Sequence, residues 1–179
     1  DLIAAAKLQP GKLTFGTPGI GTTQHMAGEL LQSLGGIELT HIPYKTNAFP
    51  DLLGGRLDFI VAAPSVSVPQ VNANKVRAIA VTSKVPLAAL PGVPVASQTI
   101  PNYEVKSWLA LAVAAGTPAD RVQKLSSEVQ AVVASEGVSK LLSAGGSLPA
   151  PSSGDALRTR IETDVLKWRI LAGRVKLES

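Results

Sequence analysis

The chain has 179 residues, of which 45% are hydrophobic and 17% are charged. This length is enough for one ordinary domain or two small lobes, and the composition excludes a disordered or fibrous chain. The net charge of +4 is spread thinly, so nucleic-acid binding is not indicated. The absence of cysteine excludes disulfide scaffolds and thiolate metal sites, and two histidines leave little room for any metal centre.

The chain shows no targeting or membrane-spanning segment. No apolar run approaches the roughly 20 residues that a spanning helix needs, and no secretory signal is recognisable. Because the sequence begins at Asp1 rather than at Met, we expect a processed or truncated product.

Apolar strands alternate with helices through the first half of the chain. Helices are predicted at Leu2–Leu8, Thr22–Leu34, Pro50–Leu53 and Val66–Asn74, and strands at Lys12–Gly16, Glu38–Tyr44, Leu57–Ala63 and Val76–Thr82. Such alternation is typical of a parallel sheet that is covered on both faces. The sequence therefore predicts an α/β fold.

The second half begins after an irregular, proline-punctuated connection over Val85–Tyr103, which we interpret as a crossing between lobes. Ser107–Ala115 is strongly apolar and predicts a strand buried on both faces. Thr117 and Pro118 indicate a helix start, with Thr117 as the cap. A short helix is expected at Val138–Ala144. We predict two sheets and two segments, 1–105 and 106–179, with the division near Val105.

Two longer helices of the second half carry apolar stripes that are expected to face inward. The first stripe holds Val122, Leu125, Val129 and Val132, and the second, on a helix from about Ser153 to Gly173, holds Leu157, Ile161, Val165, Trp168 and Ala172. Core packing is the expected role of Trp108 as well.

The most informative stretch is the glycine-rich turn GTPGIGTTQH, residues 16–25, which leads from a strand into a helix. Its glycines allow close approach to a ligand, and the free N–H groups and dipole of the helix start favour an anion. Thr22 and Thr23 add hydroxyl donors. The alternative is a tight turn that needs glycine only for its backbone angles.

Nucleotide-binding patterns do not fit this turn. The P-loop pattern GxxxxGK[ST] matches Gly16, Gly21 and Thr23, but Thr22 stands at the lysine position. The dinucleotide pattern GxGxxG fails because Gln24 stands where the third glycine belongs.

Three other side chains are candidates for contact with a ligand. Lys45 follows Tyr44 at a strand end, where the ligand-facing loops of open α/β sheets lie, and it either pairs with a carboxylate or is solvated. His25 is either on the ligand side of its helix or a partly buried, hydrogen-bonded histidine. Ser65 either lines a pocket or is an ordinary loop serine.

The remaining polar residues indicate no chemistry. His41 has no partner at metal-binding spacing and Asp58 alternates with apolar neighbours, so both are expected to be structural. Neither a nucleophile elbow nor an HExxH motif is present. No catalytic residue, metal site or cofactor is predicted.

The order of motifs resembles a known family. The segments are TFGTPGIGTTQHMAGELL, HIPYK, DLLGGRLDF, KVRAIAVTS, LPGVP and SWLALAVAAGTPADRVQKL. They are similar to the extracytoplasmic solute receptors of the tripartite tricarboxylate transporter system, the Bug family. The resemblance implies a periplasmic protein without enzymatic activity, in which two α/β lobes close on a small carboxylate. It also implies delivery of that ligand to the membrane components of a transporter.

The resemblance also implies a set of ligand-binding residues. They are Thr17, Gly19, Gly21, Thr22, Thr23 and His25 in the glycine-rich turn, and Tyr44 and Lys45 in a family Tyr-Lys-Gly motif; Ser65 joins them on the residue-based argument above. Two positions depart from the family, since Thr46 replaces the glycine and Ala62-Ala63 replace a frequent Asp-Asn.

Family members begin with a further α/β segment that this sequence lacks, so we expect one complete and one partial lobe. Both would be lobes of the periplasmic-binding-protein type, with mostly parallel sheets flanked by helices. Self-association, exchange of elements between copies or a companion fragment would then stabilise residues 106–179. The alternatives to a solute receptor are a non-binding truncated remnant acting as an interaction module, and a small α/β enzyme on an anionic substrate.

Overall fold

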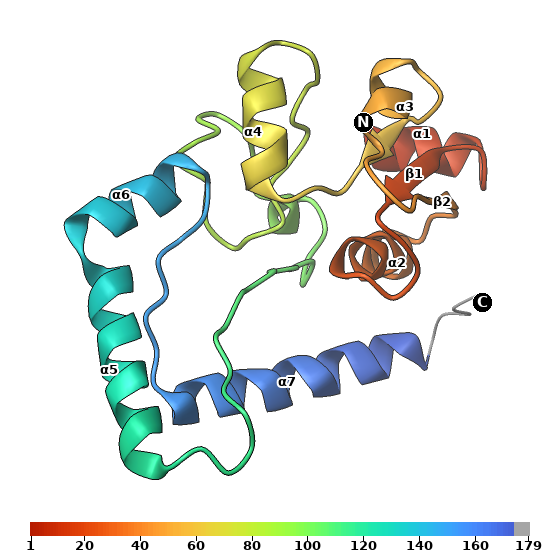
Figure 1. Cartoon of the computed structure of the whole chain (residues 1–179). Coiled ribbons are helices and arrows are strands. Elements are labelled where there is room, and N and C mark those ends of the chain that lie inside the picture. Colours follow the sequence, from red (N-terminus) through yellow and green to blue (C-terminus); the bar gives the residue numbers. More distant parts are fainter. Residues whose placement is uncertain (174–179) are drawn as a thin grey trace.

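The computed structural model describes residues 1–173 (Figure 1). Residues 174–179, the end of the predicted second segment, lie outside the described part. The helices are α1 (Leu2–Leu8), α2 (Thr23–Gly35), α3 (Phe49–Leu53), α4 (Pro64–Asn72), the 3₁₀ turn η1 (Ala96–Gln98), α5 (Ala119–Ala134), α6 (Glu136–Ala144) and α7 (Gly154–Ala172). The strands are β1 (Thr14–Thr17), β2 (Thr40–Pro43) and β3 (Phe59–Ile60).

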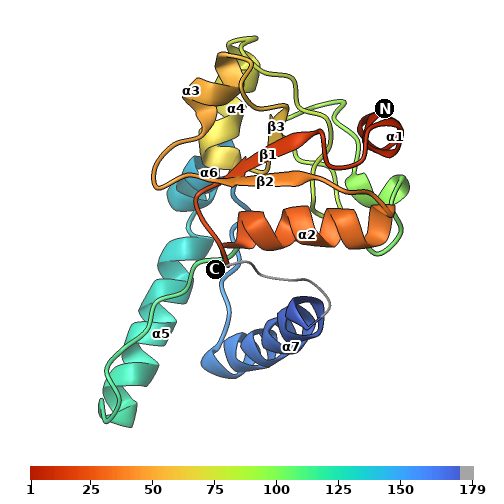
Figure 2. The ribbon, with the colours of Figure 1, turned by 90° about the vertical axis from the view of Figure 1, so that its right-hand side faces the viewer.

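The three strands form one parallel sheet in which β1 lies between β2 and β3. Phe15 of β1 is the Cα partner of His41 on one side and of Phe59 on the other. Helix α2 covers one face of this sheet, whereas α3 and α4 lie on the opposite face (Figure 2). The chain passes from β1 to β2 through α2, and then returns from β2 past β1 to β3 through α3. These two connections run in opposite directions along the sheet, so right-handedness places them on opposite faces. The predicted α/β class is confirmed.

The core of this lobe forms where α2 packs on β1. Phe15 is fully buried and stacks on Phe59, with 5.8 Å between the ring centroids. Helix α2 approaches very closely at Gly28, where an added Cβ would lie 2.1 Å from a ring carbon of Phe15. Within the same core, the Tyr103 hydroxyl donates to the carbonyl of Ala27 over 3.1 Å and fastens the proline-rich connection to α2.

Two predicted strands are wrong, and the expectation of two sheets is wrong within residues 1–173. Val76–Thr82 contributes only an isolated bridge, between Val81 and Val95, and Ile79 is exposed. Ser107–Ala115 is irregular, and Leu109 in its middle is entirely exposed. An apolar run becomes a strand only when a neighbour supplies hydrogen bonds and cover, and no described strand pairs with Ser107–Ala115.

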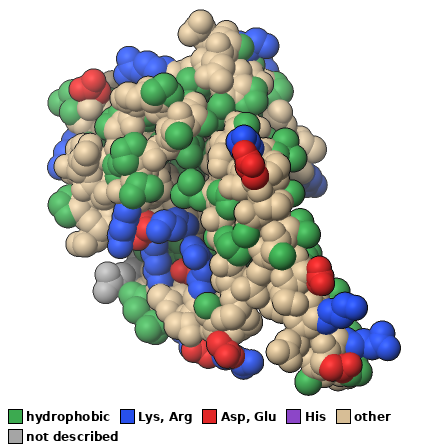
Figure 3. Space-filling model, turned by 90° about the vertical axis from the view of Figure 1, so that its left-hand side faces the viewer, with side chains coloured by type: hydrophobic (Ala, Val, Ile, Leu, Met, Phe, Trp, Pro, Cys, Tyr) green, Lys and Arg blue, Asp and Glu red, His purple; other side chains and the backbone are tan. Residues whose placement is uncertain are grey.

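The helices of the second half form as predicted, but much of each apolar stripe is left uncovered. Val122, Leu125 and Val132 of α5 and Ile161 and Val165 of α7 are all exposed. The face shown in Figure 3 likewise has hydrophobic side chains spread among polar ones. Beyond residue 105, Leu171 is the only buried hydrophobic side chain of the described chain.

The start of α5 also differs from the prediction. Thr117 does not cap it, because its hydroxyl donates to the carbonyl of Ala114 over 2.8 Å and Pro118 occupies the cap position. Proline lacks an N–H group, and a helix that begins after it loses no donor there.

Besides the buried turn at Gly146, which lies against Pro64 of α4, helix α7 also reaches the first lobe. It runs beside α2 (Figure 1), and Trp168 packs against the core of the first lobe. The ammonium of Lys167 donates to the carbonyl of Glu104. The half-buried indole of Trp108 donates to the Asp164 carboxylate over 2.6 Å, which ties the irregular 107–115 segment to α7.

The close approach at Gly28 predicts a steric effect. Gly28→Ala forces a Cβ into the buried ring of Phe15, so we expect a loss of about 1–3 kcal/mol in the free energy of unfolding. Gly137→Ala in α6 is the control, because its Cβ would meet nothing within 4 Å, and it should stabilise by roughly 0.5–1 kcal/mol. Denaturant titration of both variants measures these changes, and equal stabilities would contradict the packing argument.

The uncovered second half predicts association. Burying one Leu or Val side chain is worth about 1.5–3 kcal/mol, so a surface that includes Leu109, Leu111 and Leu141 favours a partner strongly. We propose that a second copy of the chain, by contact or exchange of elements, or a companion fragment covers residues 106–173. Sedimentation velocity at micromolar concentration should show species larger than a monomer. A stable monomer with protected amides over residues 107–115 would refute this proposal.

Candidate functional site

The candidate site is the edge of the sheet at which all three strands end. The loop from Thr17 to Thr22 follows β1, Tyr44 and Lys45 follow β2, and residues 61–63 lead from β3 into α4. The chain leaves β1 through α2 on one face and leaves β3 through α4 on the other (Figure 2). Neighbouring parallel strands whose connections diverge in this way leave a crevice between their carboxyl ends, and ligands of open α/β folds bind there.

The loop after β1 owes its shape to two glycines and to a capping threonine. Gly19 has φ +147° and Gly21 has φ +77°, which are conformations that other residues rarely adopt. The Thr22 hydroxyl donates to the carbonyl of Gly19 over 2.7 Å and accepts from the amide of His25 over 3.3 Å. Thr22 therefore closes the turn and caps α2 at the same time.

Three amides at this turn remain available to a ligand. Gly21 N–H donates to Nδ1 of His25, Gly19 N–H to the Thr17 hydroxyl and Thr22 N–H to the carbonyl of Gly19. No described residue accepts a hydrogen bond from the amides of Ile20, Thr23 and Gln24. Unpartnered N–H groups at the start of a 13-residue helix favour an anion through both hydrogen bonding and the helix dipole.

Two of the predicted ligand residues lie beneath the loop. The Thr17 side chain is 1% exposed and His25 is 4% exposed. Thr17 Oγ1 lies 2.6 Å from Nε2 of His41, and the His41 ring stacks on that of His25 with 4.0 Å between centroids. Thr17 and His25 thus hold the loop from below, whereas Thr22 and Thr23 are half-buried at its surface.

Both histidines are held in the neutral form. Burial lowers the pKa of His25, and it lowers the pKa of His41 to about 4, with the neighbouring charge of His25 as the second cause. Because Nδ1 of His25 accepts from Gly21, its ring proton resides on Nε2, which faces a carboxylate oxygen of Glu29 at 3.5 Å. The two rings therefore carry no charge toward an anion at neutral pH.

The candidates on the other two strand ends are less enclosed. Tyr44 donates its hydroxyl to Asp51 over 2.7 Å, and Asp51 also pairs with Arg56 at 2.6 Å. The hydrogen bond raises the pKa of Tyr44 and lowers that of Asp51. Lys45 is exposed at the end of β2, and Ser65 is exposed in the first turn of α4.

Sequence reasoning missed part of this arrangement. It predicted a structural role for His41 but not its contact with Thr17, and it did not identify Asp51, Ile20 or Gln24 as part of the site. The contact of His41 with Thr17 spans 24 positions and depends on the pairing of β1 with β2, which no local pattern reveals. The amides of Ile20 and Gln24 carry no side-chain signal at all. The expected role of Asp58 is confirmed, since its carboxylate accepts from the amide of Thr14 over 2.7 Å.

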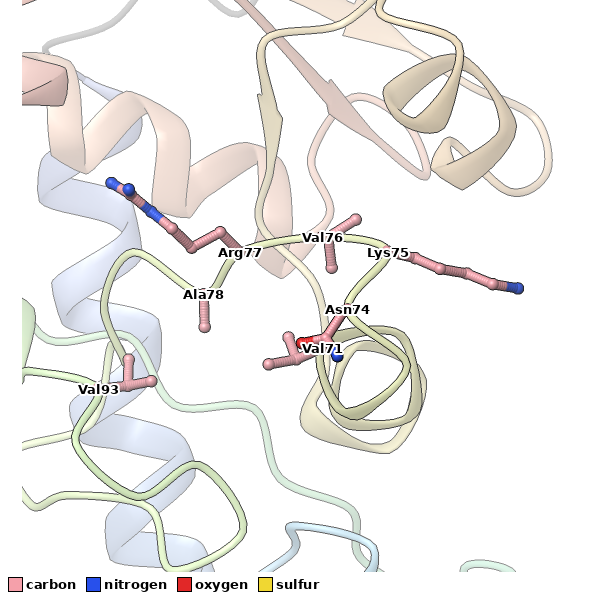
Figure 4. Close-up of a pocket in the computed structure, with 7 residues that line it drawn as sticks. All are labelled: Val71, Asn74, Lys75, Val76, Arg77, Ala78 and Val93. Atoms are coloured by element: carbon pink, nitrogen blue, oxygen red, sulfur yellow. The ribbon is translucent and has the colours of Figure 1, made fainter.

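Two shallow hollows elsewhere on the surface do not compete with this edge. One, of about 410 Å³, is lined by Val71, Val93 and residues 74–78 (Figure 4). Its two cations, Lys75 and Arg77, extend in opposite directions and do not converge on a common ligand (Figure 4). The other, of about 320 Å³, lies between α1 and the end of α2, at the opposite edge of the sheet. Within residues 1–173, no three His, Asp or Glu side chains gather as metal ligands would.

These observations define an α/β lobe whose sheet edge favours an anion. Comparison with known proteins identifies the family. A family model described as "Tripartite tricarboxylate transporter family receptor" matches residues 1–177. The chain belongs to this family, also called TctC, to which the Bug proteins are related. It is a family of substrate-binding receptors rather than of enzymes, and its solved members include a periplasmic binding protein.

Individual relatives agree with this assignment. A curated protein from Pseudomonas sp. (strain P51), the UPF0065 protein in the tcbD-tcbE intergenic region, is 31% identical over 183 residues, which cover 100% of this chain and 54% of that protein. The solved structure "R. palustris Rpa4515 with adipate" has a TM-score of 0.89 at 29% identity and covers 96% of this chain and 58% of that one. The solved structure of the periplasmic binding protein BugD has a TM-score of 0.84 at 28% identity, and the match covers 99% of this chain and 61% of BugD.

The chain therefore spans about half the length of the curated relative and about three fifths of these solved structures. The predicted family and fold class are confirmed. Among residues 1–173, no helix has both the length and the apolar character that crossing a bilayer requires.

The double role of Thr22 predicts a measurable loss of stability. Thr22→Ala removes the cap of α2 and the bond to Gly19, so we expect about 0.5–2 kcal/mol less free energy of unfolding. Thr22→Ser keeps a hydroxyl at the same place and should stay close to the parent protein. Thermal and denaturant unfolding compare the two variants, and equal losses would show that the hydroxyl does not cap the helix.

Proposed function

We propose that the protein is a periplasmic receptor that binds a small carboxylate at the carboxyl edge of its three-stranded sheet and delivers it to the membrane components of a tripartite transporter. The observation that carries this proposal is the group of unpartnered amides of Ile20, Thr23 and Gln24 in a chain of the receptor family. The bound adipate of one relative at 29% identity supports a dicarboxylate as the ligand.

The chemistry of the edge suits a carboxylate. Its two oxygens accept hydrogen bonds, and the loop offers amide donors together with the hydroxyl of Thr23, whereas the Thr22 hydroxyl already donates to Gly19. No acidic residue lies between Thr17 and Gln24, so nothing in the loop repels a negative charge. Lys45 at the end of β2 adds a cation at the same edge. We assign Thr17, Gly19, Gly21 and His25 to the shape of the loop, and Tyr44 and Ser65 to its neighbouring strand ends.

The geometry also argues against turnover at this edge. Thr17 and His41 are as close as a hydroxyl nucleophile and its base, at 2.6 Å, but the Thr17 side chain is only 1% exposed. A substrate atom cannot reach a hydroxyl that is closed off in this way, and the pair serves to hold the loop. Binding without reaction is the function that remains.

The proposal is tested by calorimetric titration of the chain with adipate near pH 7. Gly21→Val should abolish binding, because valine cannot adopt φ +77° without strain and the loop must rearrange. Gly116→Val is the matched control, since it places the same strain at φ +84° in the second half of the chain. Binding that survives in Gly21→Val would remove this loop from the site. A folded parent protein that binds no dicarboxylate would favour the non-binding remnant instead.

A further inference from the structure

The stacked rings of His25 and His41 suggest a role other than the direct ligand contact that the family resemblance implies for His25. They lie below the turn that carries the amides, and each is bonded to a different end of it. His41 contacts the hydroxyl of Thr17, the last residue of β1, at 2.6 Å. Nδ1 of His25 accepts from the amide of Gly21, just before the cap of α2, over 3.0 Å.

We propose that His25 and His41 are a loop-positioning pair, two neutral stacked rings that fix both ends of the Thr17–Thr22 turn and so aim its amides at an anion. This inference rests on the proposed function, because it concerns the same edge. It differs from a direct ligand role for His25, since the ring is 4% exposed and its one free acceptor is already used by Gly21.

The proton positions follow from the contacts. Gly21 donates to Nδ1 of His25, so that nitrogen carries a lone pair. Glu29 lies 3.5 Å from Nε2 on the other side of the ring and favours the tautomer with the proton there. The single hydroxyl proton of Thr17 serves the shorter contact to His41, which leaves Oγ1 free to accept from the amide of Gly19 over 3.2 Å. Both nitrogens of the His25 ring and Nε2 of His41 then have a partner without a charge on either ring.

Protonation would break this arrangement. A proton on Nδ1 of His25 turns the acceptor of Gly21 into a second donor, and a charge would lie 4.0 Å from the neighbouring ring. The titratable groups that face His25 are Glu29 of its own helix and His41 of β2, while β1 contributes the non-titrating Thr17 and Phe15. Burial lowers the pKa of both histidines, so at these two side chains the folded state binds fewer protons than the unfolded chain once the pH falls to about 6.5, whereas the pKa of Glu29, raised by burial, acts in the opposite sense. Acidification therefore loosens the turn.

The sign of the pH effect separates positioning from direct contact. A histidine that binds the ligand as a cation would strengthen anion binding when it becomes protonated. A positioning histidine weakens binding, because the amides lose their arrangement. Adipate itself begins to titrate in the acid range, so the primary measurement is made on the ligand-free protein.

The experiment follows the Gly21 amide by hydrogen exchange and the imidazole nitrogens by NMR from pH 8 to pH 5, in the full chain. In the parent protein the Gly21 amide should be protected near neutral pH and lose protection on acidification as His25 becomes protonated. His25→Asn places an amide oxygen near the position of Nδ1 and should keep protection without its pH dependence. His25→Phe keeps a ring in the stack but has no acceptor. Near neutral pH the Gly21 amide of this variant should exchange about tenfold faster than in the parent, the effect of one lost hydrogen bond, and the difference should disappear on acidification.

Adipate titration of the same variants at neutral pH completes the test. His25→Phe should bind about tenfold more weakly than the parent, and His25→Asn about as well. An unchanged Gly21 amide in His25→Phe, or tighter binding on acidification, would overturn the positioning role. If the amide responds as expected but no variant binds adipate, the positioning pair stands and the proposed ligand is wrong.

Discussion

The contact between Gly28 of α2 and the ring of Phe15 sets how closely that helix lies on the central strand. Helix α2 begins at the turn that follows β1, so its distance from the strand also sets the depth of the turn. At this short distance His25, one turn before Gly28, reaches the ring of His41 on β2 and the amide of Gly21. A side chain at position 28 would lift the helix and separate these groups, because packed interiors do not yield easily. The candidate site therefore depends on a glycine that does not belong to it.

The first lobe buries its own core, whereas the second half does not. The connection between them is fastened at Tyr103, whose hydroxyl bonds to the middle of α2. Beyond it, α5 and α6 bury no side chain among the described residues, and α7 reaches the first lobe at Leu171 and Trp168. The chain also spans only about three fifths of the solved relatives that it matches. Among residues 1–173, the candidate anion site therefore lies on the half that buries its own core.

Local patterns predicted what local interactions decide. The predicted helix Thr22–Leu34 forms as α2, and Gly36 ends it in the left-handed conformation, because both signals are local. The hydrogen bond of Asp58, in contrast, joins residues 44 positions apart, so its partner Thr14 could not be identified from the local pattern. Ser107–Ala115 has the composition of a buried strand, but strand formation depends on a neighbour that local composition cannot supply. The histidine stack depends on the register of β1 against β2 and on the distance set at Gly28, so His25 was placed on the correct loop without its partner.

The two tryptophans make the second half of the chain observable by fluorescence. Both lie beyond residue 105, at positions 108 and 168, while the first lobe holds the two tyrosines, Tyr44 and Tyr103. Trp168 packs against the core of the first lobe, and Trp108 is half-buried with its indole N–H on the carboxylate of Asp164. Tryptophan emission therefore reports almost entirely on residues 106–173 and on their docking to α2. Binding at the edge of the sheet would change tryptophan emission only if it altered the contact between the two halves. Changes in emission would therefore report on residues 106–173 and not on the Thr17–Thr22 turn itself.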